Sequence, residues 1–272
     1  MASIPFTPLP PPAVPHRATV LRNALERTGL IRQPQPQGVA TPPLRLLLGE
    51  TRSRVESWRA WRRLRGREIA PAAIARTVML LPGFGTRPER MHRLHAGLTA
   101  AGHRVCDWGL GLNLGGTPER LDALCERIAA GAAREGESLV LVGWSLGGLY
   151  AREAAKRVPE SVRLVVTLGS PFSGDLHANN AWRAYQWITG QDVAAPPIPG
   201  DLAAKPPVPT IALWSPRDGI VAPRAARGRP GERDAAVALR CRHLSFASHP
   251  EVVAAVLRLL DGHAAEIQRR PG

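Results

Sequence analysis

The sequence predicts an α/β fold in which a mostly parallel sheet carries helices on both faces. From about residue 70 onward, short apolar segments of strand length alternate with longer segments of helical periodicity. The short segments are apolar without interruption, which is typical of strands buried on both faces of a parallel sheet. With 272 residues, of which 44% are hydrophobic, the chain is long enough to enclose one substantial core.

Strands and helices take turns through this region. The expected strands span residues 77–81, 104–108, 138–142, 163–168, 210–214 and 237–241. The expected helices span residues 87–101, 118–133, 146–158 and 250–267. Pro118 and Pro250 stand in the first turn of two of these helices, where a missing N–H breaks no hydrogen bond.

The first 70 residues differ in composition from the rest. Residues 1–43 are rich in proline, which favours extended backbone and predicts a loose arm. Residues 44–70 combine leucine and tryptophan at roughly helical spacing with arginine, which predicts a basic amphipathic helix. Two interpretations stay open: weak peripheral contact with a membrane through residues 44–67, or a helix whose tryptophans pack on the main domain while its arginines face water.

The main domain is expected to span residues 71–272. Within it, residues 172–208 lack the alternation of strands and helices and end in a proline-rich stretch. A segment of this kind between two strands is a candidate lid. The chain is therefore divided into an arm, a basic helix and an α/β domain with a small insertion.

The formal net charge of +14 comes almost entirely from arginine, since Lys156 and Lys205 are the only lysines. A basic surface attracts nucleic acid or anionic lipid. The sequence has no zinc-finger spacing, aromatic RNA-binding strand or helix-turn-helix signature, so we do not expect nucleic-acid binding. Three scattered cysteines predict neither a disulfide framework nor a metal cluster. Without a signal-peptide pattern or an apolar run near the ~20 residues that span a bilayer, a cytoplasmic location is expected.

The clearest chemical motif is G-x-S-x-G at residues 143–147, with Ser145 at its centre. It directly follows the expected strand 138–142 and precedes the expected helix 146–158, which is the arrangement of a nucleophile elbow. Such a turn strains the serine backbone and exposes its hydroxyl, and side chains at positions 143 and 147 would collide with the crossing strand and helix. The motif predicts that Ser145 is a nucleophile for acyl transfer.

A nucleophilic serine needs N–H donors for the oxyanion that forms when it attacks a carbonyl. The backbone N–H of Leu146 is the first expected donor, because it follows the serine in the elbow. The second is expected in the loop after strand 77–81, where residues 80–86 read L-L-P-G-F-G-T. We expect this donor to be the backbone N–H of Phe84.

The serine also needs a histidine that accepts its proton. In chains with a nucleophile elbow, the histidine comes last, after the acid. His243 lies just past strand 237–241, in the loop that leads to the final helix, and is the preferred candidate. His249 is the main alternative, although it stands next to Pro250 and can equally cap the helix or wall the substrate site.

A carboxylate is needed to orient this histidine. Asp218 lies immediately beyond strand 210–214 and precedes Gly219, which allows a short turn toward the histidine loop. Asp175, after the preceding strand, is the alternative acid. Either aspartate can instead bond its own backbone in a turn.

Together these motifs resemble the α/β-hydrolase superfamily, and within it the bacterial serine lipases and esterases. The resemblance rests on L-L-P-G-F-G at 80–85, G-W-S-L-G-G at 143–148, L-G-S-P-F at 168–172, S-P-R-D-G-I-V at 215–221 and H-L-S-F-A-S-H-P-E-V from 243. It covers about residues 75–262 and implies that Asp218 is the acid and His243 the base. Strands before residue 77 are hard to recognise, so we expect a sheet smaller than the family's usual eight strands.

The resemblance implies a serine hydrolase that cleaves a small-molecule or lipid ester through an acyl-enzyme on Ser145, with no metal or organic cofactor. Candidate pocket residues are Trp108, Asn113, Trp144 and His249. Apolar and aromatic residues near the motifs favour a hydrophobic acyl group. The alternatives are an acyltransferase or a thioesterase on the same scaffold, and a non-catalytic binding protein that retains the fold.

Overall fold

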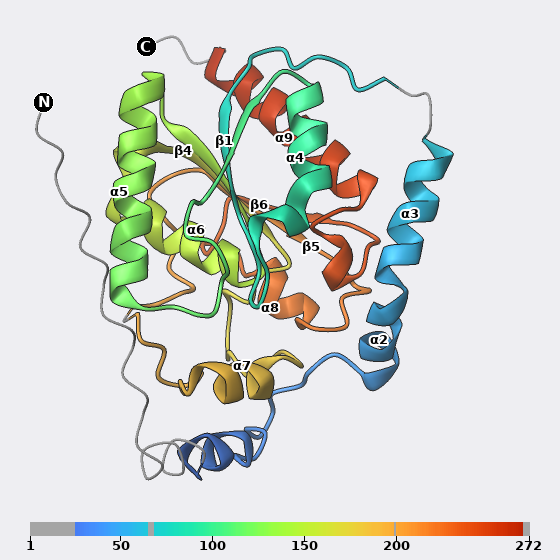
Figure 1. Cartoon of the computed structure of the whole chain (residues 1–272), viewed down its shortest axis with the longest axis vertical. Coiled ribbons are helices and arrows are strands. Elements are labelled where there is room, and N and C mark those ends of the chain that lie inside the picture. The colour runs from blue at the N-terminus through green and yellow to red at the C-terminus, as the bar shows by residue number, and fades with distance from the viewer. Residues whose placement is uncertain (1–24, 65–67, 199, 269–272) are drawn as a thin grey trace, which may run out of the picture.

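A computed structural model describes residues 25–64, 68–198 and 200–268 of the chain. Its core is a six-stranded, all-parallel sheet with the strand order β2-β1-β3-β4-β5-β6. Helices cover both faces of this sheet (Figure 1). This architecture confirms the predicted fold class, and within the described residues the sheet has six strands, fewer than eight.

The strands follow the apolar segments of the sequence. They are β1 (Thr77–Leu81), β2 (Arg104–Asp107), β3 (Leu139–Trp144), β4 (Val162–Leu168), β5 (Thr210–Trp214) and β6 (Ala235–Ala238). The expected strand 237–241 is displaced, because Leu239 and Cys241 are buried in the core beyond the end of β6. The Leu239 N–H still donates a hydrogen bond of 2.8 Å to the carbonyl of Trp214 at the end of β5, whereas Cys241 is buried in the core from the loop that follows.

Two pairs of helices enclose the sheet. On one face, α4 (His92–Ala100) packs against α9 (Pro250–Gln268), and their side chains share a core with Val78 and Leu80 of β1. On the other face, α5 (Pro118–Glu135) packs against α6 (Leu146–Arg157), in a core with Met79 and Leu81. Alternate residues of β1 therefore serve opposite cores, as expected for a strand buried on both faces.

The basic segment forms two helices in place of the single helix expected over residues 44–70. α2 (Leu44–Gly49) and α3 (Ser53–Arg63) are joined by the 3-10 turn η1 (Glu50–Arg52), and residues 65–67 lie outside the described residues. α3 packs on the loop that contains residue 243 and on α9. Trp61 Nε1 donates a hydrogen bond of 2.7 Å to the carbonyl oxygen of Ser248.

The remaining segments surround the carboxyl ends of the strands. The expected arm lies outside the described residues up to residue 24, and residues 25–31 form a helix beside α7 (Trp182–Thr189) at the foot of the molecule (Figure 1). Gln186 of α7 donates a hydrogen bond of 2.8 Å to the carbonyl of Leu30. The short α8 (Pro223–Arg227) packs on β5.

Two further properties concern the described part of the chain only. None of its helices combines the length and the apolar character needed to cross a membrane. Nor do three or more His, Cys, Asp or Glu side chains within those residues gather in a group that could hold a metal ion.

Candidate active site

Ser145 occupies the sharp turn between β3 and α6. Its backbone angles are φ 53° and ψ −119°, and it is the only non-glycine residue with a positive φ among the described residues. A non-glycine residue is held in this region only when its surroundings enforce it. Here its N–H donates a hydrogen bond of 2.9 Å to the carbonyl of Leu168, at the end of β4.

The glycines around Ser145 are needed for close backbone contact. A Cβ atom on Gly143 would collide with the backbone of Gly147, and a Cβ atom on Gly147 would collide with the carbonyl oxygen of Leu81. The crossing strand and helix therefore leave no room for side chains at these two positions. The same collisions explain why the elbow motif has glycine on both sides of the serine.

His243 and Asp218 form a buried pair. The distance between His243 Nδ1 and Asp218 Oδ2 is 2.8 Å, and both side chains are almost fully buried. Asp218 Oδ1 accepts hydrogen bonds from the N–H groups of Ile220 and Val221, at 2.8 and 2.7 Å. With both carboxylate oxygens accepting, Nδ1 of the neutral imidazole carries the proton and Nε2 is its basic nitrogen.

Two opposing effects set the pKa of His243. Burial lowers this pKa, whereas the charge of Asp218, its hydrogen bond and the charge of Glu50 raise it. The raising effects win, so the pKa lies above the ordinary value of 6.5. An imidazole held in this way accepts a proton more readily than a free histidine does.

The pair and the elbow meet at the carboxyl edge of the sheet. Trp144, which precedes the serine, donates a hydrogen bond of 3.2 Å from Nε1 to the carbonyl of His243. A Cβ atom on Gly169 at the end of β4 would come within 3.2 Å of Asp218 Oδ2. Among the described residues, no hydrogen bond joins the Ser145 hydroxyl to His243. Such contacts are often long without substrate and shorten when it binds.

The alternative residues lie apart from this pair. Asp175 bonds His177, with 2.7 Å between its Oδ1 and the histidine Nδ1, and its side chain is 41% exposed. His249 Nδ1 accepts a bond of 3.3 Å from the N–H of Glu251 in the first turn of α9.

The two expected oxyanion donors lie beside Ser145. Leu146 is the first residue of α6, where its N–H has no carbonyl of an earlier helical turn to bond. Phe84 lies in the loop after β1, and Asn113 fixes that loop by donating a bond of 2.7 Å to the carbonyl of Pro82. The Asn113 carbonyl also accepts a bond of 2.7 Å from the N–H of Gly85. Phe84, Leu146 and Ser145 all line the same cavity.

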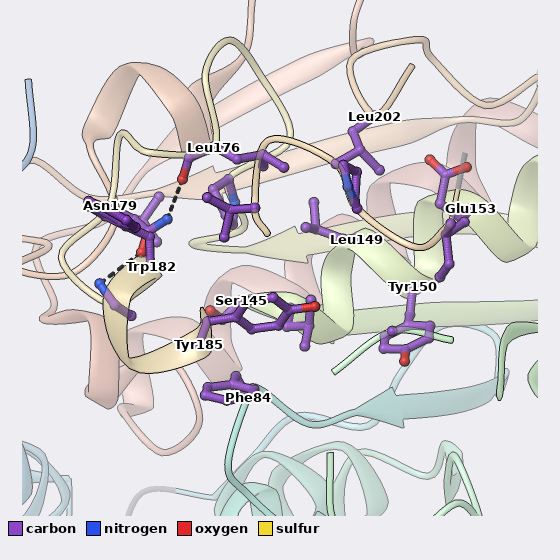
Figure 2. A pocket seen from close by; sticks show the side chains of 18 of the residues that line it. Phe84, Ser145, Leu149, Tyr150, Glu153, Leu176, Asn179, Trp182, Tyr185 and Leu202 are labelled. Atoms are coloured by element: carbon purple, nitrogen blue, oxygen red, sulfur yellow. Dashed lines mark hydrogen bonds between the residues drawn. The ribbon is translucent and has the colours of Figure 1, made fainter. Parts of the chain in front are cut away.

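This cavity has an empty volume of about 900 Å³, including space that is open to solvent. Figure 2 shows Ser145 in its middle, with Tyr185 and Phe84 close by and Leu149 and Tyr150 further along. The rings of Phe84 and Tyr185 are in contact, with 5.1 Å between their centroids. Most of the lining is apolar, and residues 176–198, including α7, form one wall.

The four residues predicted as possible pocket lining lie outside the lining of the cavity. None of Trp108, Asn113, Trp144 and His249 is among the described residues that line the cavity. Trp108 is fully buried and packs edge-on against Tyr150. Through the hydrogen bonds given above, Asn113 holds the loop after β1, Trp144 bonds the His243 carbonyl, and His249 bonds the start of α9.

Arg152 was missed at the sequence level, although it fixes one wall of the cavity. It is fully buried in α6, and burial lowers its pKa to about 10. Its guanidinium donates to the carbonyls of Leu202, Ala203, Ala204 and Glu232. Leu202 lines the cavity, so this arginine anchors the wall that follows residue 200. The signal in the sequence was a charged residue between Ala151 and Ala155 on the apolar side of the helix.

The sheet, the elbow and the placement of the buried pair define an α/β-hydrolase fold. Solved structures share it. One is a monoacylglycerol lipase from Paleococcus ferrophilus, with a TM-score of 0.51 and 20% identity over 71% of this chain and 96% of its own. Another is MGS-MChE2, an α/β-hydrolase enzyme from a lagoon-sediment metagenome, with a TM-score of 0.51 and 21% identity over 71% of this chain and 94% of its own. The α/β-hydrolase fold that the sequence resemblance implied is thereby confirmed.

Part of the chain is also similar in sequence to one curated protein. That protein is a pimeloyl-[acyl-carrier protein] methyl ester esterase from Edwardsiella ictaluri (strain 93-146), 35% identical over 109 residues. The matched part spans 39% of this chain and 40% of that protein, so less than half of the relative is covered. No family model matches the chain.

Proposed function

We propose that the chain is a serine hydrolase that cleaves carboxylic esters through an acyl-enzyme on Ser145. The observation that carries this proposal is the strained Ser145 elbow in the wall of an apolar cavity, at the sheet edge that also holds the buried His243–Asp218 pair. The partial match to a methyl ester esterase supports ester chemistry of this kind.

In the proposed reaction, His243 Nε2 takes the proton of Ser145 Oγ as this oxygen attacks the ester carbonyl. The resulting oxyanion is stabilised by the N–H groups of Phe84 and Leu146. As the carbonyl re-forms, the bond to the alcohol oxygen breaks, and His243 returns the proton to the departing alcohol. Water, deprotonated by the same imidazole, then attacks the carbonyl of the acyl-enzyme. The bond to Ser145 Oγ breaks, His243 returns the proton to this oxygen, and the acid is released, while Asp218 stabilises each imidazolium.

The substrate class follows from the cavity. Its lining offers aliphatic and aromatic side chains and few charges, Glu153 being one, and that carboxylate is paired with Lys156 at 2.6 Å. A hydrophobic acyl chain gains free energy by leaving water for such a lining. We therefore propose esters with an apolar acyl group, held under residues 172–208 acting as a lid.

The direct test is hydrolysis of p-nitrophenyl esters from acetate to palmitate, together with labelling by a fluorophosphonate probe. The proposal expects hydrolysis with a preference for acyl chains longer than acetyl, and covalent labelling of Ser145. Products formed with competing alcohols or from thioesters separate hydrolysis from acyl transfer and thioesterase activity. A folded chain that neither hydrolyses any ester nor reacts with the probe would be a binding protein, and the proposal would be wrong.

Filling the cavity is expected to shorten the accepted acyl chain. Leu149 lines the cavity from α6, and Leu149→Trp places an indole in the space available to the acyl group. The ratio of kcat/KM for octanoate to that for acetate should fall by about 10-fold or more. Leu48→Trp, at an exposed position of α2, is the matched control and should keep the wild-type ratio. An unchanged ratio in Leu149→Trp would show that the acyl chain binds elsewhere.

We also propose that the outer face of α2 and α3 contacts an anionic lipid surface. Leu48, Val55 and Trp58 are 64%, 48% and 51% exposed on this face. Six exposed arginines accompany them: Arg45, Arg52, Arg54, Arg59, Arg62 and Arg63. Apolar side chains between cations complement a bilayer with negative headgroups, whereas a neutral bilayer offers no charge attraction.

Vesicle flotation tests this contact. The chain is expected to float with phosphatidylserine-containing vesicles at low salt and to stay behind with phosphatidylcholine vesicles. Trp58→Ala combined with Arg59→Gln should reduce flotation several-fold. Trp187 is an exposed tryptophan on α7, and Trp187→Ala should leave flotation unchanged. Absence of flotation at low salt, or equal flotation with both vesicles, would overturn the proposal.

A further inference from the structure

Glu50 is a buried carboxylate whose partners are backbone N–H groups. Its residue is only 4% exposed, which is rare for glutamate. Oε1 accepts bonds of 2.9 Å from the N–H groups of both Gly219 and His243, and Oε2 accepts a bond of 3.0 Å from the N–H of Leu244. Within the described residues it has no cationic side chain as a partner. These bonds to a charged acceptor are what make its burial tolerable.

The two loops that Glu50 joins are those of the buried pair. Gly219 follows Asp218 directly, and the other two N–H groups belong to His243 itself and to its neighbour. One carboxylate therefore fixes the spacing between the loop of the acid and the loop of the base. It bonds the His243 N–H, while Trp144 bonds the His243 carbonyl, so the backbone of this residue is held from both sides.

Close packing supports the same link. A Cβ atom on Gly219 would collide with the carbonyl of Leu46, so α2 lies directly against the loop of the acid. Ser245 Oγ donates a bond of 3.2 Å to the carbonyl of Ser53 at the start of α3. The segment ahead of the α/β core thus contacts both loops through backbone as well as through Glu50.

Charge adds a second consequence. The charged groups that face His243 are Asp218 from the loop after β5 and Glu50 from η1, and the rings of Trp144 and Phe246 complete its surroundings. Nearby, Arg242 is paired with Glu56 of α3 at 3.0 Å. Removing the Glu50 charge takes away one of the groups that favour the imidazolium.

We propose that Glu50 is a positioning residue of this hydrolase, which sets the distance and orientation between Asp218 and His243 and favours the protonated imidazole during turnover. The proposal rests on the proposed function. It assigns part of the catalytic arrangement to residues outside the α/β core. It also explains why η1 carries an acid in a segment otherwise rich in arginine.

Two variants test separate aspects of this role. Glu50→Gln keeps the length but turns an NH₂ group toward the Leu244 N–H and removes the charge. It is expected to lower kcat by about 10-fold to 100-fold with little change in KM. Because neutral His243 is the base, kcat/KM rises with pH through its pKa, and in Glu50→Gln the midpoint of this rise should move to lower pH. Glu50→Asp keeps the charge but loses reach, so kcat should fall while the midpoint moves less.

Glu56→Gln is the control, since it removes an acid of α3 that bonds the Arg242 side chain but accepts no bond from the backbone N–H groups of residues 219, 243 and 244. It should keep wild-type kcat and midpoint. Wild-type kcat and midpoint in both Glu50 variants would overturn the positioning role, and so would failure of both to fold, because Glu50 would then be structural. If the wild-type chain hydrolyses no ester, the proposed function itself fails and the positioning role fails with it, a distinguishable outcome.

Discussion

Ser145→Ala is expected to lower kcat for ester hydrolysis by about 10⁴-fold to 10⁶-fold. The change removes the proposed nucleophile, whereas the proposed oxyanion donors and the cavity remain. KM should therefore change little, and labelling by the fluorophosphonate probe should disappear. Steady-state kinetics and mass spectrometry of the labelled chain measure both effects.

Ser161→Ala is a suitable control, since this serine is buried in the 3-10 turn before β4, away from the cavity. It should retain wild-type activity and labelling. If Ser145→Ala still hydrolyses esters at more than about one hundredth of the wild-type rate, another nucleophile carries the reaction.

Asp218→Asn is expected to lower kcat by about 10⁴-fold, for a reason that its hydrogen bonds make specific. The N–H groups of Ile220 and Val221 both point at Oδ1, so the amide oxygen must occupy that position. The amide NH₂ then faces His243 Nδ1 and donates to it. The imidazole is left with its proton on Nε2, where it cannot accept the proton of Ser145.

The same variant should lower the pKa of His243, because the charge that raises it is gone. An NMR titration of the histidine ring protons can follow this shift. Asp175→Asn is the matched control: its carboxylate pairs with His177 and not with His243. Were Asp175→Asn the inactive variant and Asp218→Asn the active one, the acid role would pass to the loop after β4.

Much of the fold could be predicted because the strands are apolar and separated by helices of clear periodicity. β1 and β5 have the bounds expected from the sequence, and β3 extends the expected strand directly to the elbow. Chain order and loop position were enough to choose His243 and Asp218, which the structure brings within 2.8 Å of each other. Local pattern works here because the carboxyl ends of parallel strands meet at one edge of the sheet.

The rest depended on tertiary contacts that a local pattern does not record. Trp108 and Trp144 are aromatic and close to the motifs, yet an aromatic residue suits a core as well as a pocket, and both are buried. The sequence pattern does not distinguish Glu50 from other acids in a charged helix, because its bonds to residues 219, 243 and 244 are tertiary contacts. Asn113 bonds the carbonyl of Pro82, which lies 31 positions earlier in the chain.

The bond between Glu50 and Leu244 joins residues 194 positions apart, and this separation has a consequence for biosynthesis. On the ribosome, Glu50 emerges long before the loop that bears His243 and stays without its partners at residues 243 and 244 until that loop has been made. Contacts so distant along the chain form late, since a large loop must first close. A nascent or prematurely terminated product that ends ahead of residue 243 therefore lacks the proposed base and leaves Glu50 without the N–H groups of residues 243 and 244.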